Sequence, residues 1–219
     1  MTDIVATEAG LVKIVHPLTV RITHWVNALA IFVMIASGWR IHNSDPILPF
    51  YFPVELTLGG SYEGSVDIHN EDGLAGALQW HFAGMWLFTV NGLFYVAYGL
   101  VSGHFRHSFF PVSPRAFLRD ALAAFRLQLA HQLGIYNAVQ KTLYLGVLIA
   151  GVIMLLSGLA IWKPGQLQEL AWLFGGFDTA RVIHFLGMTA IVLFLVVHIA
   201  LVIIVPGTLL AMITGRGKI

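Results

Sequence analysis

The chain has 219 residues, of which 58% are hydrophobic and only 11% are charged, and its formal net charge is +1. Soluble domains carry about 25% charged residues, so this composition indicates a membrane protein and argues against the soluble classes. The chain has no cysteine, which excludes disulfides, thiolate metal sites and covalent c-type haem attachment.

Four apolar stretches are each long enough to cross a bilayer, which takes about 20 apolar residues in a helix. They cover roughly residues 18–42, 74–103, 138–162 and 180–205. Residues 1–15 lack the apolar centre of a cleavable signal peptide, so the first span is expected to insert the chain. We therefore predict an all-α membrane protein, a four-transmembrane-helix bundle that forms a single domain over residues 1–219 and has no internal repeat.

The distribution of lysine and arginine gives the expected topology. Nine basic residues flank the spans on one side: Lys13, Arg21, Arg106, Arg115, Arg119, Arg126, Lys141, Arg216 and Lys218. Three lie on the other side: Arg40, Lys163 and Arg181. By the positive-inside rule, both termini and the middle loop are cytoplasmic, in a bacterial inner membrane. This topology accounts for the basic residues, so no nucleic-acid partner is expected.

Two loops carry further signals. The outer loop, residues 43–72, is rich in proline, glycine and carboxylates, and an ordered loop of this length is often a binding loop. In the cytoplasmic loop, Ser113 and Pro114 are favourable for a helix start, and apolar residues such as Phe117 and Leu122 follow at helical spacing. We predict an amphipathic helix there that lies on the membrane surface among the lipid headgroups.

Two histidines, His184 and His198, lie fourteen residues apart in the fourth span. In an α-helix this spacing places both imidazoles within about 40° of one face and about 21 Å apart along the axis. That distance fits inside a hydrocarbon core of about 30 Å. Ionisable residues at membrane depth are costly and mark functional sites, so the spacing predicts two metal centres, one near each membrane surface.

The threading of the spans gives each of these histidines a partner at its own depth. His24 shares the inner depth with His198, and His81 shares the outer depth with His184. Facing histidines in a helical bundle suit a haem b held by two axial imidazoles. Zinc takes three or four ligands, often with a carboxylate, and the spans contain no Asp or Glu. We therefore predict two haem b groups with these four histidines as iron ligands.

Other residues leave alternatives open. Small residues lie beside the histidines: Gly38, Ala83, Gly84, Ser157, Gly158 and Gly187. They could make room for a porphyrin, and they could equally serve helix packing in lipid. Surface positions are the simpler interpretation of the remaining histidines, with His42 and His16 as spare ligand candidates. Basic residues at the membrane surfaces suit haem propionates or snorkelling anchors: Arg21, Arg40, Lys141 and Arg181.

Four motifs stand out along the chain: RITHWVNALAIFVMIASG (21–38), QWHFAGMWLF (79–88), YNAVQK (136–141) and HFLGMTAIVLFLVVH (184–198). Together they resemble the bacterial cytochrome b561 and Ni,Fe-hydrogenase b-type cytochrome superfamily, which includes formate dehydrogenase cytochrome b subunits. The resemblance implies a four-helix subunit with two b haems, whose ligands fall on His24, His81, His184 and His198. It also implies a quinone beside the start of the third helix, which points to Asn137, Gln140 and Lys141. Polar residues that simply cap the helix at the membrane surface are an equally good interpretation of this cluster.

The resemblance further implies electron transfer between the quinone pool and a periplasmic redox partner. The long outer loop with PVELTLGG (53–60) is similar to cytochromes associated with sulfite-oxidase-like proteins, so a molybdopterin oxidoreductase is the candidate partner. Two other functions stay open. One is an autonomous superoxide:quinone oxidoreductase, although an acidic outer loop does not attract an anion. The other is a hydrogenase-type cytochrome b subunit. An electron-transfer subunit is favoured over a stand-alone enzyme.

Overall fold

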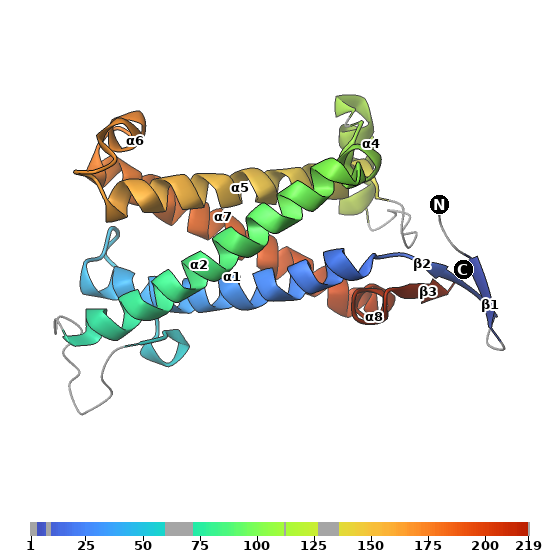
Figure 1. The fold of residues 1–219 in the computed structure, drawn as a ribbon, viewed down its shortest axis with the longest axis horizontal. Coiled ribbons are helices and arrows are strands. Elements are labelled where there is room, and N and C mark those ends of the chain that lie inside the picture. The colour runs from blue at the N-terminus through green and yellow to red at the C-terminus, as the bar shows by residue number, and fades with distance from the viewer. Residues whose placement is uncertain (1–3, 8–9, 60–71, 112, 127–135, 219) are drawn as a thin grey trace. The chain divides into compact units, whose positions relative to one another are not determined.

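The computed structural model describes residues 4–7, 10–59, 72–111, 113–126 and 136–218 (Figure 1). In chain order its elements are β1 (Ile4–Thr7), β2 (Gly10–Ile14), α1 (Leu18–Ser44), the 3₁₀ turn η1 (Val54–Leu56), α2 (Asp72–Val101), α3 (His104–Phe109), α4 (Pro114–Phe125), α5 (Ala138–Trp162), α6 (Gln168–Leu173), α7 (Phe177–Ile204), α8 (Pro206–Thr214) and β3 (Arg216–Lys218).

Four of these helices, α1, α2, α5 and α7, are long and apolar enough to cross a membrane, which confirms the four predicted spans. Their candidate spans are Leu18–Ser44, Gly76–Val101, Ala138–Trp162 and Phe177–Ile204. Buried residues in these helices are mostly small, such as Ala30 and Ala160, whereas large apolar residues such as Leu93 and Leu186 are exposed. Small residues let helices approach each other, and lipid solvates the large apolar ones.

The fourth long helix begins three residues earlier than the predicted span. Gly175 and Gly176 both have positive φ angles, 78° and 93°. Glycine adopts this left-handed backbone without steric cost, so the turn is completed there and α7 begins directly after it, at Phe177.

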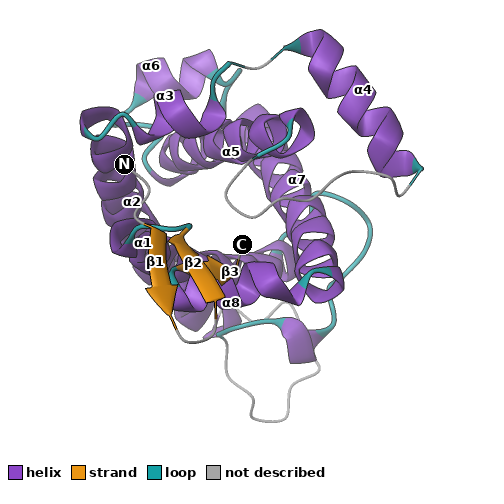
Figure 2. Ribbon diagram, turned by 90° about the vertical axis from the view of Figure 1, so that its right-hand side faces the viewer, coloured by secondary structure: helices purple, strands orange, loops and turns teal. Residues whose placement is uncertain are grey.

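The two ends of the chain form a small sheet that was not predicted. β1 pairs with β2, and β2 pairs with β3, in both cases antiparallel. Gly215, with a φ of +79°, turns the chain from α8 into β3, and its carbonyl accepts the N–H of Val15 at 2.9 Å. Figure 2 shows the three strands beside α8. Strands of three to five residues are too short for periodicity to predict them.

A helix is present in the loop between α2 and α5, as predicted. It is α4, which begins at Pro114, and the Ser113 hydroxyl accepts the N–H of Ala116 at 3.5 Å. Phe117 and Leu122 are exposed on it. Its position on a membrane surface stays a prediction.

The chain divides into two compact units. Unit 1 contains Met1–Ile22, Phe94–Val152 and Ala190–Ile219, and unit 2 contains Thr23–Leu93 and Ile153–Thr189. Each of the four long helices contributes residues to both units. His81 and His184 both belong to unit 2, whereas His24 belongs to unit 2 and His198 to unit 1.

In unit 1, side chains bond to the backbone at the ends of other helices. Arg21, in the first turn of α1, donates two hydrogen bonds to the end of α8. Its Nε donates to the Met212 carbonyl at 3.3 Å, and its Nη2 donates to the Ile213 carbonyl. Asp120 of α4 accepts the N–H of Ala138, the first residue of α5, at 2.9 Å. Cations stabilise helix C-termini and carboxylates stabilise helix N-termini, so both contacts are favourable.

In unit 2, α1 packs against α2 and α5 packs against α7 at glycines. A Cβ atom on Gly84 would lie 2.8 Å from Cγ of Met34, and one on Gly187 would lie 2.7 Å from Sδ of Met154. A larger residue fits at neither position unless the methionine moves. The sequence left two roles open for these glycines, space for a porphyrin and close packing of helices, and the structure shows that Gly84 and Gly187 serve helix packing.

Candidate functional site

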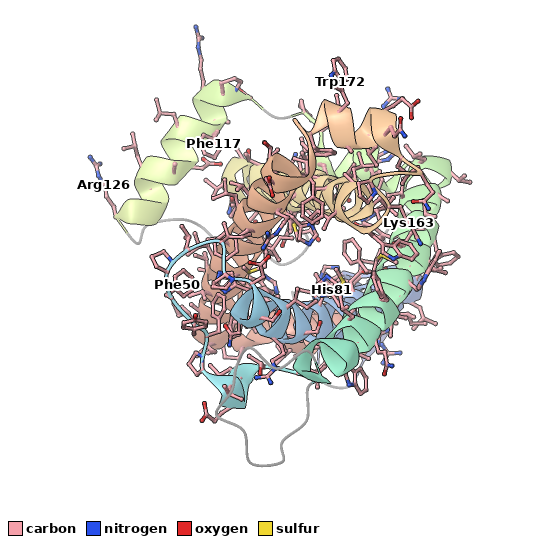
Figure 3. The ribbon with its side chains drawn as sticks, turned by 90° about the vertical axis from the view of Figure 1, so that its left-hand side faces the viewer. Phe50, His81, Phe117, Arg126, Lys163 and Trp172 are labelled. Atoms are coloured by element: carbon pink, nitrogen blue, oxygen red, sulfur yellow. The ribbon has the colours of Figure 1, made fainter. Side chains whose placement is uncertain are left out.

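His81 of α2 and His184 of α7 face each other in unit 2. Their ring centroids are 6.3 Å apart, and the ring planes make an angle of 63°. Figure 3 labels His81 on its helix. The structure therefore brings these two predicted site residues together.

A serine of the neighbouring helix determines which nitrogen of His81 carries the proton. The Ser37 hydroxyl donates its single hydrogen to the Val33 carbonyl, 2.7 Å away, so its oxygen accepts from Nδ1 of His81 at 3.1 Å. We therefore assign the proton to Nδ1, which leaves Nε2 with a lone pair.

His184 has the same arrangement with α5. The Ser157 hydroxyl donates to the Ile153 carbonyl at 2.7 Å and accepts from Nδ1 of His184 at 2.9 Å. The proton again belongs on Nδ1, and Nε2 again keeps a lone pair for a ligand.

Each of these serines is followed by a glycine that lies against the edge of the imidazole. A Cβ atom on Gly38 would lie 3.5 Å from Cε1 of His81, and one on Gly158 would lie 3.2 Å from Cε1 of His184. At Gly158 the distance is closer than most Cβ contacts, so the missing side chain makes room for the ring of His184, a use that the sequence did not suggest. At Gly38 the distance is an ordinary van der Waals contact.

These contacts reveal an internal repeat. α1 carries MIASG (34–38) where α5 carries MLLSG (154–158), and α2 carries HFAGM (81–85) where α7 carries HFLGM (184–188). The equivalent serines, histidines and methionines make equivalent contacts. The prediction of no internal repeat is therefore wrong. The repeat was missed because serine and histidine are 44 residues apart in the first copy and 27 in the second.

The His81–His184 pair has the dimensions of a metal site with two imidazole ligands. A metal–imidazole bond is about 2 Å long and the ring centroid lies about 1 Å beyond the nitrogen, so two such rings across a metal have centroids about 6 Å apart. The observed 6.3 Å agrees. The described part of the chain has no group of three or more His, Cys, Asp or Glu that could hold a bare metal ion. The ring separation is compatible with an iron held by two axial imidazoles.

His24 and His198 lie on α1 and α7, in different units. In unit 2, His24 is half-buried and makes an edge contact with Trp25, with centroids 5.1 Å apart. In unit 1, His198 is half-buried and stacks on Phe194, with centroids 5.6 Å apart. The pairing of these two histidines stays a prediction.

A polar contact beside His24 was not predicted. Asn91 of α2 donates from Nδ2 to the Thr23 carbonyl at 2.8 Å and to Oδ1 of Asn27 at 2.7 Å. Both bonds join α2 to the part of α1 that carries His24. An asparagine in an apolar span was the available signal, because a buried amide requires hydrogen-bond partners.

The other predicted site residues lie at the starts of helices in unit 1. The guanidinium of Arg21 bonds to the end of α8, as described above. Oε1 of Gln140 accepts the N–H of Asn137 at 3.1 Å, and Oδ1 of Asn137 accepts the N–H of Gln140 at 2.9 Å. These reciprocal bonds form a capping box at the start of α5. Lys141 lies in the same turn and is half-buried. Contact of these residues with a quinone stays a prediction.

The segment that follows α1 is held within unit 2 by side-chain and backbone contacts. Asn43 clamps Phe52 through two bonds of 2.8 and 2.9 Å, the Leu58 N–H donates to the Ala36 carbonyl at 3.0 Å, and Arg181 pairs with Asp45 at 2.9 Å. Ala36 directly precedes Ser37, so this segment reaches the helix next to the histidine pair. Residues 60–71 of the outer loop lie outside the described residues.

The two spare histidines have other surroundings. The ring of His42 is 6% exposed and lies against Phe50 and Phe185, with centroids 5.1 and 5.2 Å away. Aromatic packing accounts for its burial. His16 lies before α1 in unit 1, where burial lowers its pKa and the positive charges of His104 and Arg21 lower it further.

The family model for prokaryotic cytochrome b561 matches residues 15–215. A protein of Azospira oryzae that is named as a protein-methionine-sulfoxide reductase subunit, YedZ1, is 45% identical over 203 residues, covering 92% of this chain and 96% of that protein. Two proteins named as Ni/Fe-hydrogenase B-type cytochrome subunits, from Cupriavidus necator and Bradyrhizobium diazoefficiens, are each 25% identical over 203 residues. They match 84% of this chain and 76% and 75% of their own lengths.

Proposed function

The chain belongs to the prokaryotic cytochrome b561 family, whose members bind haem b, and on this premise we propose that it carries electrons between the quinone pool and a periplasmic redox protein. The observation that supports this most directly is the His81–His184 pair. Its centroids are separated by 6.3 Å, and serines on α1 and α5 hold the protons on the two Nδ1 atoms. Both Nε2 atoms are therefore left to bind iron.

We propose two haem b groups for each chain. His81 and His184 would hold one, and His24 and His198 would hold the other. Haem supplies one-electron exchange at an iron whose potential depends on its axial ligands, its burial and nearby hydrogen bonds. The chain's own residues hold that iron, keep water away through apolar helices and orient the ligand rings.

The proposed topology gives the two centres different neighbours. With cytoplasmic termini, the His81–His184 centre lies toward the periplasm and the start of α5 lies toward the cytoplasm. Asn137, Gln140 and Lys141 are the proposed quinone contacts, because they gather amide and ammonium groups at the mouth of a span. Arg21 remains a candidate for a propionate only if its bonds to α8 are exchanged.

The relative from Azospira oryzae supports a reductase as the partner. It is named as a subunit of a protein-methionine-sulfoxide reductase and matches this chain over 96% of its length. We propose that this chain is the membrane subunit of such an oxidoreductase and passes electrons from quinol to a periplasmic, molybdopterin-dependent subunit. A hydrogenase partner is less favoured, because the relatives with that name are only 25% identical.

Reduction by quinol tests the proposal. The purified chain in lipid nanodiscs should show b-type absorption bands, two haems per chain by the pyridine haemochrome assay, and full haem reduction when a quinol is added. The reduced protein should then be reoxidised by its molybdopterin subunit and not by buffer. Absence of b-type bands, or haems that quinol leaves oxidised, would count against the proposal. Reduction by superoxide without any partner would favour a stand-alone enzyme.

A further inference from the structure

The serines that bond to His81 and His184 are placed alike in the two copies of the repeat. Ser37 Oγ lies 2.7 Å from the Val33 carbonyl and 3.1 Å from Nδ1 of His81, while Ser157 has corresponding distances of 2.7 and 2.9 Å. Both serines are fully buried, with 0% of their surface exposed. A buried hydroxyl that makes the same two bonds in both copies has a more specific use than filling space.

We propose that Ser37 and Ser157 are positioning residues that set the ring orientation and the electron-donating strength of the two axial histidines, and hence the redox potential of the haem between them. This inference rests on the proposed ligation by His81 and His184. An acceptor on Nδ1–H makes an imidazole more basic and fixes its tautomer. A more basic ligand favours oxidised iron over reduced iron, so the serines keep the potential of this haem low.

The hydroxyl hydrogen explains why serine suits this position. In a helix, a serine hydroxyl can donate to the carbonyl four residues back, which leaves its oxygen as a pure acceptor toward the neighbouring helix. The serine then cannot donate to the imidazole and stabilise the wrong tautomer. Threonine has the same hydroxyl and makes the same intrahelical bond. It is therefore the conservative variant that should preserve the effect.

The test compares redox titrations of the full-length holoprotein in nanodiscs. Ser37→Ala, Ser157→Ala and the double variant should keep two haems, with the midpoint potential of one haem more positive and the other unchanged. The shift should be largest in the double variant. Loss of the outer partner of a metal ligand typically weakens metal binding by about 10-fold or more. Transfer of this haem to excess apomyoglobin should therefore accelerate by about that factor.

Two sets of variants separate positioning from a general packing effect. Ser37→Thr and Ser157→Thr should give the wild-type potential and haem-transfer rate. Thr189→Ala is the matched control, because Thr189 on α7 makes the same kind of intrahelical bond, to the Phe185 carbonyl at 2.9 Å. It should also behave as wild type. If the alanine variants do not fold, Ser37→Cys and Ser157→Cys replace them, since a thiol is only a weak acceptor.

The outcomes distinguish this inference from the proposed function. Wild-type potential and haem transfer in the double alanine or double cysteine variant would overturn it, as would an equal shift in Thr189→Ala. If His81→Ala and His184→Ala lose one haem while the serine variants match wild type, only the positioning role fails. If those histidine variants retain both haems, the ligand assignment itself fails and the positioning role fails with it.

Discussion

The helix pair α1–α2 and the helix pair α5–α7 carry the same contacts around His81 and His184 but different residues in the segments that carry His24 and His198. Tyr144 of α5 precedes Ser157 by the same number of residues as His24 of α1 precedes Ser37. Tyr95 of α2 likewise follows His81 by the same number of residues as His198 of α7 follows His184. In unit 1, Tyr144 contacts Tyr136 and Tyr95 contacts Phe105, with centroids 5.0 and 5.4 Å apart. These tyrosines therefore pack with aromatic rings.

This difference indicates how a repeated helix pair can contribute to two unlike centres. The His81–His184 centre takes equivalent residues from both helix pairs, so its two sides have matching hydrogen bonds. The proposed second centre takes His24 from one helix pair and His198 from the other, at positions that are not equivalent within the repeat. We therefore expect the two centres to respond differently to substitutions.

The largest effect is expected from removal of an axial histidine. His81→Ala and His184→Ala should each lose the same haem, because each leaves one iron with a single imidazole, whereas His24→Ala and His198→Ala should each lose the other. Haem stoichiometry by pyridine haemochrome and the potential of the remaining haem measure this. Tyr144→Phe should retain both haems. Two haems per chain in any one of the histidine variants would contradict the pairing.

A smaller effect, on the free energy of unfolding, is expected from substitution of closely packed glycines in unit 2. Gly59, in the segment between α1 and α2, has a φ of +88°, and a Cβ atom there would lie 2.4 Å from the backbone nitrogen of Ala77. Gly59→Ala should cost roughly 3 kcal/mol, because neither the backbone angle nor the backbone contact can relax. Gly84→Ala and Gly187→Ala meet movable methionines and should cost about 1 kcal/mol each.

Unfolding in mixed detergent micelles measures these costs. Equal losses in Gly84→Ala and Gly187→Ala would support the equivalence of the two helix pairs. A loss in Gly59→Ala no larger than theirs would contradict the close backbone contact.

The spans and the His81–His184 pair could be predicted because both depend on one-dimensional signals. Long apolar runs determine membrane helices, and an imidazole within such a run is costly enough to indicate a function. Alternation of span direction then placed His81 and His184 at one depth, and the structure brings their rings together.

The role of the serines could not be predicted from the sequence. Ser157 was considered only as a small residue, because nothing in a single helix shows which neighbour its hydroxyl contacts. For Asn137 and Gln140 the sequence leaves quinone contact and helix capping open, and the structure shows the capping bonds. The contact of Asp120 with Ala138 joins residues 18 positions apart and has no periodic signal.

A pH-dependent difference is expected between the starts of α1 and α5. The hydrogen bond from Ala138 lowers the pKa of Asp120 below 3.8, and Arg119 lowers it further, while burial opposes them. The contribution of Asp120 to stability is therefore present above pH 3.8 and is lost as the pH falls through the lower folded pKa. The start of α1 has a different contact, because Arg21 there bonds to backbone carbonyls of α8.

Hydrogen exchange of the α5 amides checks this difference. Acidification should lower the protection factors, which are corrected for the intrinsic exchange rate at each pH, in the first turn of α5 and leave those in the first turn of α1 unchanged. Asp120→Asn at neutral pH should reproduce the effect, with a loss of about 1 kcal/mol. Equal loss of protection in both helices at acid pH would argue against a role for Asp120.

The smallest effect is expected where the first helix pair has a polar contact and the second has none. Asn91 and Asn27 bond to each other at 2.7 Å, whereas the equivalent positions of α7 and α5 are Phe194 and Val147. Asn91→Leu should cost about 0.6 kcal/mol, the usual value for a hydrogen bond between membrane helices. The same detergent unfolding measures it. The double variant Asn27→Val with Asn91→Phe should cost less than Asn91→Leu, because removal of both partners leaves no buried amide unsatisfied. If the double variant loses more unfolding free energy than Asn91→Leu, the residues of the second helix pair cannot replace Asn27 and Asn91 in the first.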